Sequence, residues 1–229
     1  MKNSDFAGTS APSGLPSRDY AALPVRRLAH ASPVDTALDA RRRAAIGVSA
    51  LLAPTPVFTA GLVGLGWFGH GAMGAGWAGV TVLFCAAAPQ IVVRRGVRRG
   101  AWSDLSVPQR RQRLLVLPVA MASATAGLIL LIALDGPREM ATAVLAAVVT
   151  SVAIFAVTTV WKVSVHTAAC AGTATVLTLA LGPWWLLCGP LVVLMGWSRV
   201  TLREHSPAQV IIGAVLASAT ALTTFALRP

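Results

Sequence analysis

The feature that most constrains this chain is a series of long apolar segments separated by short polar ones. Windows of about 18 or more apolar residues are long enough to cross a bilayer as helices. We predict five such spans, with the ranges 44–68, 75–93, 114–134, 141–161 and 207–227. A further apolar segment, 166–197, is too long for one span and holds Gly182-Pro183 in its middle, so two short spans joined by a tight turn are expected there.

The chain is therefore expected to be all-α, a polytopic transmembrane helix bundle of seven spans. The number would be six if the segment around Pro54 and Pro56 lies in the membrane interface instead. Residues 1–43 are polar, rich in Ser, Ala and Pro, and lack an apolar stretch of signal-peptide length. They are predicted to form a disordered cytosolic tail, which leaves residues 44–229 as a membrane-embedded helical domain.

The net charge of +11 is concentrated on one set of polar segments. Seven arginines lie in 94–113 and five more lie just before the first span, whereas the only Lys or Arg in the alternating segments 69–74, 135–140 and 182–183 is Arg138. Those five are Arg26, Arg27, Arg41, Arg42 and Arg43. Because positively charged loops tend to remain in the cytoplasm, the N-terminus and the 94–113 loop of a cell-membrane protein are predicted to be cytoplasmic. Nucleic-acid binding is not expected, because basic residues are not interleaved with aromatic ones on a folded face.

Counting the spans brings three polar blocks to the same membrane face. The Arg-rich loop follows two spans, WKVSVH (161–166) follows two more, and WSRVTLREH (197–205) follows the short pair. Ionisable side chains beside spans are costly unless they are paired or functional. The blocks combine cations, histidines and hydroxyls with few acids, which suits an anionic group such as phosphate. Their members are Arg110, Arg111, Arg113, Lys162, Ser164, His166, Ser198, Arg199 and His205.

The segment SRVTLREH (198–205) resembles the Ser-Arg-x5-His-x3-Asp motif of the type 2 phosphatidic acid phosphatases, the lipid phosphate phosphatases related to vanadium haloperoxidases. VSVH (163–166) is similar to the Pro-Ser-Gly-His motif of that family and keeps its serine and histidine. PQRRQRLLVLP (108–118) lies where the family has a Lys-x6-Arg-Pro motif and is similar to an Arg-x2-Arg form of it. The order and spacing of the three motifs also fit, and the resemblance covers residues 104–213.

The resemblance implies a phosphatase that needs no metal and no cofactor. By this resemblance His205 attacks phosphorus and becomes a phosphohistidine, while His166 protonates the leaving alkoxide. A metal site is not expected, because two histidines without nearby thiols or paired carboxylates make a poor ligand set. The groups that would bind the phosphate are Arg110, Arg113, Ser164, Ser198 and Arg199, with Arg111 and Lys162 as further candidates.

Two departures from the family motifs bear on this chemistry. Val165 replaces a glycine that would let backbone amides approach a phosphate closely. Gln209 replaces an aspartate four residues after the last histidine. Its carbonyl oxygen can accept the N–H of His205 one helical turn away, but it adds no negative charge. In serine proteases the analogous Asp→Asn change costs about 10⁴ in rate, so Gln209 is expected to allow catalysis but to slow it.

The expected function is hydrolysis of a phosphomonoester or diphosphate of a membrane lipid, for example a polyprenyl phosphate. Span parity places the site on the cytoplasmic side. The alternative is a non-catalytic membrane protein that binds anionic lipid through the same basic cluster, and the residues at 165 and 209 favour it. Arg203 and Glu204 are expected to be solvated loop charges, and His70 is given no role. No sequence feature specifies an oligomeric state.

Overall fold

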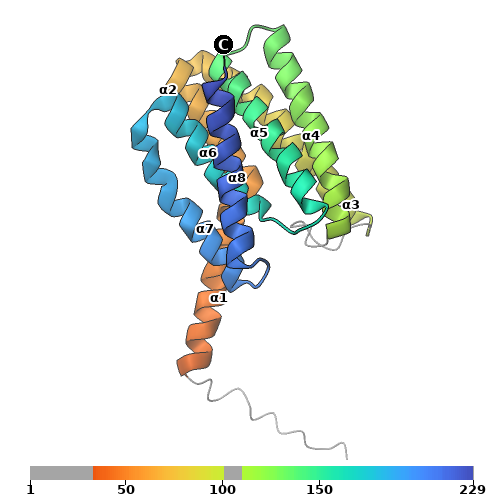
Figure 1. Cartoon of the computed structure of the whole chain (residues 1–229), viewed down its shortest axis with the longest axis vertical. Coiled ribbons are helices and arrows are strands. Elements are labelled where there is room, and N and C mark those ends of the chain that lie inside the picture. The colour runs from red at the N-terminus through yellow and green to blue at the C-terminus, as the bar shows by residue number, and fades with distance from the viewer. Residues whose placement is uncertain (1–32, 101–109, 229) are drawn as a thin grey trace, which may run out of the picture. The chain divides into compact units, whose positions relative to one another are not determined.

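The computed structural model describes residues 33–100 and 110–228, with side chains described for 37–100 and 116–228. Within these ranges the regular elements are helices, and none is a strand. The chain divides into two units at Leu38, a residue inside the first helix, and the second unit, Asp39–Pro229, holds the rest of that helix and all the later ones. The elements are α1 (Pro33–Leu51), α2 (Pro54–Val82), the π-helix η1 (Leu83–Ala87), α3 (Ala88–Arg98), α4 (Arg110–Ala133), α5 (Arg138–Thr158), α6 (Val165–Leu181), the 3-10 helix η2 (Pro183–Cys188), α7 (Gly189–Thr201) and α8 (Pro207–Ala226) (Figure 1).

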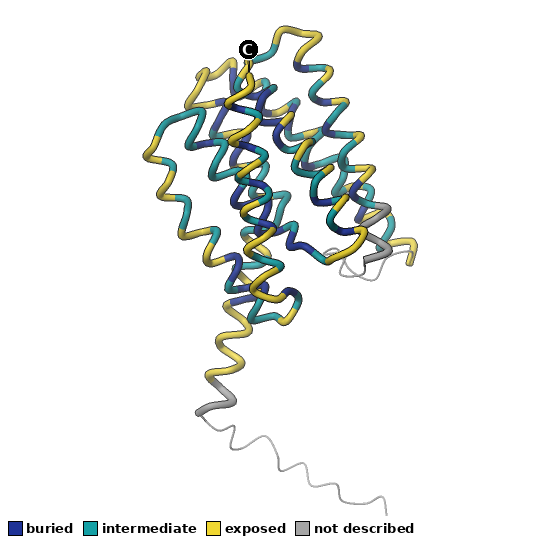
Figure 2. The backbone as a smooth tube through the Cα atoms, in the orientation of Figure 1, coloured by how far each residue is buried: buried dark blue, intermediate teal, exposed yellow. Residues whose placement is uncertain are grey.

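The composition and exposure of the helices are consistent with a helical membrane protein. Figure 2 shows exposed residues along the outside of the bundle. Many of them are large and apolar, such as Ile132 on α4, Val152 on α5 and Val215 on α8. Extensive exposed apolar surface suits contact with lipid better than contact with water. Four helical segments of the described residues are long and apolar enough to cross a membrane, namely Pro54–Arg98, Val116–Ala133, Arg138–Thr158 and Pro207–Ala226.

The predicted first span, 44–68, is not one helix. Helix α1 ends at Leu51, and α2 begins at Pro54 after the extended residue Ala53, whose φ is −61° and ψ is 156°. The break arises because Pro54 and Pro56 lack backbone N–H donors, and the residue before a proline is disfavoured in the α conformation. The expected single span is therefore divided into two helices at its prolines.

The predicted boundary of the N-terminal tail, at residue 43, lies inside a helix. Helix α1 begins at Pro33, and proline suits the first turn of a helix because its missing N–H would have no partner there. The alanine and arginine residues that follow have high helix propensity. Residues 33–43 are therefore helical, and the rest of the predicted tail, 1–32, lies outside the described residues.

The chain reverses its direction within α2, at Gly71. This residue has φ 61° and ψ −142°, a conformation that glycine adopts without the steric cost of a Cβ. The segments on either side touch, because a Cβ built on Gly66 would lie only 2.3 Å from the backbone oxygen of Gly74. The reversal separates 54–70 from 72–98, in agreement with the predicted connection at 69–74 between the first two spans.

We expect Gly66→Ala to lower the free energy of unfolding by about 1–3 kcal/mol, because the added methyl group would meet the backbone of Gly74. The control is Gly76→Ala, where a Cβ would have nothing within 4 Å. That change should be neutral or slightly stabilising, since alanine has the higher helix propensity. The midpoints of thermal unfolding of the two detergent-solubilised variants, followed by circular dichroism, are compared. Equal midpoints would contradict the close approach at the reversal.

Helices α6 and α8 lie side by side and bring their first turns together (Figure 1). Their close approach requires Gly213, where a Cβ would lie 2.6 Å from the backbone oxygen of Ser164. The backbone N–H of Ser164 donates to the backbone oxygen of Gln209 at 3.2 Å. Ser164 is also the N-cap of α6, and Ser206 is the N-cap of α8 in a capping box with Gln209. The packing therefore joins the two helix starts that carry the histidines.

Two apolar clusters hold the bundle together. The first joins α2, α4, α5 and α6 through buried side chains that include Leu65, Leu131, Met140, Val144 and Leu177. The second joins α4, α5, α6 and α8, and its buried members are Leu117, Ile154, Ala168 and Ala217. Small residues in the second cluster let the helices approach one another closely, as is common in membrane bundles.

Candidate active site

Two of the three predicted polar blocks lie together. Lys162, in the connection between α5 and α6, donates from Nζ to the backbone oxygen of Glu204 at 2.6 Å. The Ser164–Gln209 backbone hydrogen bond joins the same two segments a few residues further along. Blocks 161–166 and 197–205 therefore meet, as the counting of spans predicts.

The third block is not placed at the site by the structure. The backbone of Arg110, Arg111 and Arg113 forms the first turn of α4, but their side chains lie outside the described residues. Their contribution to phosphate binding stays a prediction.

His205 is oriented by Gln209, one helical turn further along the chain. The Nδ1 atom of His205 lies 3.1 Å from Oε1 of Gln209. The same Oε1 accepts the backbone N–H of Ser206 at 3.2 Å, which fits its assignment as the carbonyl oxygen of the amide. Nδ1 must then be the donor, so that in the neutral imidazole Nε2 carries the lone pair. The side chain is 5% exposed, and burial helps to fix the ring.

Arg199 is a buried cation, with only 1% of its surface exposed. Its Nη1 donates to the hydroxyl of Ser49 on α1 at 2.8 Å, and its Nη2 donates to the carboxylate of Glu204. Among the described residues Nε of Arg199 has no hydrogen-bond partner. Ser49 could not be found from the sequence, because a single hydroxyl in a helix distant in the chain has no motif around it.

The expectation that Glu204 is a solvated loop charge is wrong. Arg203, with φ 56°, ends α7 in a Schellman turn, in which the N–H of Glu204 donates to the backbone oxygen of Arg199 at 3.1 Å. This turn folds the loop back over the last turn of α7 and brings the Glu204 carboxylate onto the Arg199 guanidinium. Arg203 itself is exposed, as predicted.

The two predicted serines make hydrogen bonds within the protein. The hydroxyl of Ser198 donates to the backbone oxygen of Ala45 on α1 at 2.7 Å and is fully buried. The hydroxyl of Ser164 accepts the N–H of Thr167 at 3.4 Å as the N-cap of α6. In these contacts Ser198 joins α7 to α1, and Ser164 begins the helix that carries His166.

A cavity of about 820 Å³ lies beside Arg199 and Glu204. Its polar lining includes His166, Arg199, Glu204 and Gln90, together with Arg94 on α3. Most of the rest is apolar and comes from α2, α4, α5 and α6. An apolar cavity with a few polar groups at one place is typical of a site for a largely apolar ligand. His205 is not among the described residues that line it, so the structure brings His166 and Arg199, but not His205, to the cavity wall.

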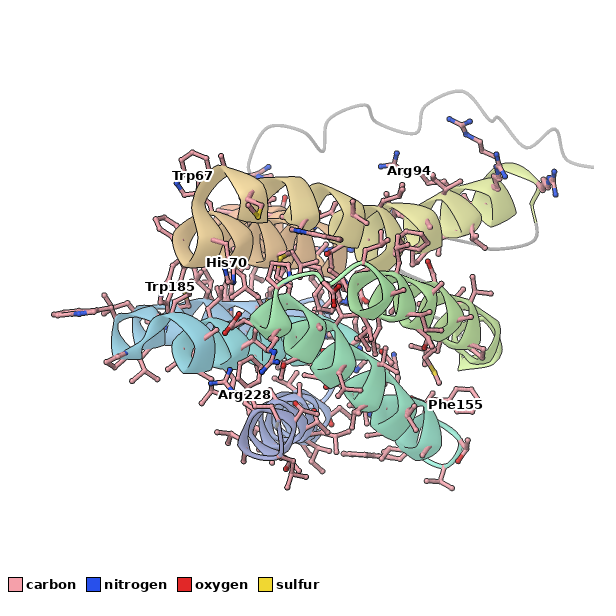
Figure 3. All side chains as sticks on the ribbon, turned by 90° about the horizontal axis from the view of Figure 1, so that it is seen from above. Trp67, His70, Arg94, Phe155, Trp185 and Arg228 are labelled. Carbon is pink, nitrogen blue, oxygen red and sulfur yellow. The ribbon has the colours of Figure 1, made fainter. Side chains whose placement is uncertain are left out.

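A second polar cluster, which no sequence motif indicates, involves His70. Its Nε2 lies 3.1 Å from the Glu139 carboxylate, at the beginning of α5. Phe68 packs edge-on against Trp185, with ring centroids 5.6 Å apart, and Figure 3 shows His70 and Trp185 on the same side of the bundle. Residues 70 and 139 are too far apart in the chain for the sequence to pair them.

Among the described residues, the structure holds no group of three His, Cys, Asp or Glu side chains arranged to bind a metal ion. The bundle combines apolar membrane-type helices with two buried histidines, His166 and His205, and a buried arginine, Arg199, and of these His166 and Arg199 line the cavity. Comparison of the chain with models of protein families, with curated proteins and with solved structures found no match. Function is therefore inferred from the chemistry of the site.

Proposed function

We propose that the protein is a membrane lipid phosphatase that hydrolyses a phosphomonoester or diphosphate through a phosphohistidine at His205. The observation that carries the proposal is the 3.1 Å contact between His205 Nδ1 and Gln209 Oε1, which leaves the lone pair on Nε2 for attack. The resemblance of 198–209 to the Ser-Arg-x5-His-x3-Asp motif of type 2 phosphatidic acid phosphatases supports it.

The proposed reaction has two displacements at phosphorus. In the first, the Nε2 lone pair of His205 forms the N–P bond, the bond to the lipid oxygen breaks, and His166 gives its proton to the leaving alkoxide. In the second, water attacks phosphorus, the N–P bond to His205 breaks and phosphate leaves, while His166, which gave up its proton in the first step, takes a proton from the water. Arg199 stabilises the charge on the phosphoryl oxygens, with Arg110 and Arg113 as predicted partners. Because His166 and Arg199 line the cavity and His205 does not, the proposed attack requires the phosphate to reach Nε2 of His205 while the Gln209 contact is kept.

The membrane arrangement belongs to the same proposal. The reversal at Gly71 divides Pro54–Arg98 into two passes, and Gly182, with φ 107°, separates α6 from η2 and α7. With α4, α5 and α8 this gives seven passes. The excess of arginine in 94–113 favours a cytoplasmic site.

Phosphate release by the purified protein tests the proposed activity. The substrates are phosphatidate, lysophosphatidate and polyprenyl mono- and diphosphate in detergent micelles, assayed with a chelator present. We expect turnover of at least one of them. Binding of these lipids without release of phosphate from any of them would support the alternative, a non-catalytic protein that binds anionic lipid. The absence of His205 from the cavity lining is the observation that favours this alternative.

Single cysteines in a background without Cys85, Cys170 and Cys188 test the orientation. Ala208→Cys, at the exposed start of α8, should resist a membrane-impermeant maleimide on intact cells and react after the cells are opened. Met73→Cys, next to the reversal and 76% exposed, should react on intact cells. The physical reason is that the arginine bias holds the 94–113 side in the cytoplasm. The opposite labelling pattern would show that the site faces away from the cytoplasm.

A further inference from the structure

We infer that Ser49, on α1, donates a hydrogen bond from its hydroxyl to the phosphate of the ligand and is a further binding residue of the site. The inference rests on the proposed function in one respect, since it takes the anionic group that enters the cavity to be a phosphate. The rest comes from the contacts between α1 and α7, which bring Ser49 beside Arg199 at the cavity wall.

Helix α1 is fixed against the end of α7 by two hydrogen bonds. The hydroxyl of Ser198 donates to the backbone oxygen of Ala45 at 2.7 Å. One helical turn further along α1, the hydroxyl of Ser49 accepts from Nη1 of Arg199 at 2.8 Å. The first contact is buried, since Ala45 and Ser198 each have 0% of their surface exposed. The two contacts together hold the Ser49 oxygen against the guanidinium.

The hydroxyl proton of Ser49 is not used within the described part of the protein. A guanidinium has donors and no acceptor, so the Ser49 oxygen must be the acceptor in its contact with Arg199. A serine inside a helix commonly donates its own proton to the backbone oxygen four residues earlier. Here that oxygen belongs to Ala45 and accepts from Ser198 instead. Ser49 therefore keeps one O–H donor that makes no hydrogen bond to another described residue.

That donor lies at the cavity together with the cation. Ser49 and Arg199 both line the cavity, and Ser49 is half-buried. A hydroxyl that accepts a hydrogen bond from a cation is polarised and becomes a stronger donor, and hydrogen bonds to an ionised acceptor are the strong ones. Glu204 is bound to Nη2 of Arg199 whereas Ser49 is bound to Nη1, so a phosphate on the Ser49 hydroxyl does not have to displace the carboxylate. An anion in the cavity is thus bound from α1 as well as from α7.

The experiment measures binding of phosphatidate in detergent micelles to the full chain carrying His205→Ala, so that the lipid is not consumed. Adding Ser49→Ala should weaken this binding about tenfold or more, because a hydrogen bond to a charged acceptor is lost. Ser49→Thr, which keeps the hydroxyl, should retain most of the affinity. Diacylglycerol with the same acyl chains has no phosphate, so its binding should not change with Ser49→Ala. The matched control is Ser151→Ala, which should leave phosphatidate binding unchanged, since Ser151 also lines the cavity but donates to the backbone oxygen of Ala147 at 2.8 Å.

A thermal melt of each variant establishes that it is folded, and Ser49→Cys replaces Ser49→Ala if the latter is not. Unchanged or tighter phosphatidate binding in the folded Ser49→Ala protein would overturn the inference, since the serine would then only occupy Nη1 of Arg199. An equal loss for phosphatidate and diacylglycerol would also overturn it, because Ser49 would then support the shape of the cavity. Neither result would affect the proposed hydrolysis. Conversely, the expected loss supports the inference even if the chain with His205 intact hydrolyses no lipid.

Discussion

His205→Ala is expected to abolish phosphate release, with a loss of at least about 10⁴-fold in kcat, while the bundle remains folded. The loss is large because no other group can form the covalent bond to phosphorus, and positioning by Arg199 alone leaves water as the only nucleophile. The initial rate of phosphate release from the best lipid phosphate measures the effect. A phosphorylated chain trapped at alkaline pH, where phosphohistidine is not hydrolysed by acid, should be found for the parent and not for the variant.

His70→Ala is the matched control, because it removes the same side chain from the pair with Glu139 rather than from the candidate site. This variant should retain the parental rate. The His205 side chain is 5% exposed, so a melting curve of each variant is needed to separate lost chemistry from lost structure. Parental activity in a folded His205→Ala protein would exclude the proposed mechanism.

Gln209→Leu should reduce kcat on the order of 10³-fold, because Nδ1 of His205 loses its acceptor and the ring is no longer held with its lone pair on Nε2. Gln209→Asp should keep or raise the parental rate, since a carboxylate can accept the same hydrogen bond and also stabilises an imidazolium. The decisive comparison is whether Gln209→Asp keeps the rate that Gln209→Leu loses. The rates are measured on the same lipid phosphate as for His205.

The same substitutions affect stability in a way that can be separated from rate. Gln209 Oε1 also accepts the N–H of Ser206 in the capping box, so the leucine variant should lose about 1 kcal/mol of stability. If the rate falls only in proportion to the amount of folded protein, Gln209 has a structural role and not a catalytic one. Equal inactivity of the parent and both variants on every lipid phosphate would favour the non-catalytic alternative.

The local features of the candidate site could be predicted from the sequence. The His205–Gln209 contact follows from a spacing of four residues at a helix start, where one turn of backbone fixes which side chains meet. The turn at Gly182 and the helices at 138–158 and 207–226 follow from apolar length and from glycine and proline signals. The meeting of 161–166 with 197–205 follows from counting spans, because each pass returns the chain to the other side.

Only the tertiary structure decided how the cation at the centre of the site is paired. Arg199 bonds to Ser49, which lies 150 residues earlier in the chain, and to Glu204, which reaches it through a turn at a non-glycine residue. The periodicity of a sequence gives the passes of a bundle but not the rotation of each helix about its axis, and that rotation determines which side chains face one another. The sequence by itself therefore determined the later apolar helices, their order and the His205–Gln209 contact, but not α1 or its separation from α2 at Pro54. Packing of α1 and the α7–α8 loop around Arg199 determined the partners of that cation, because those contacts join segments that are distant in the chain.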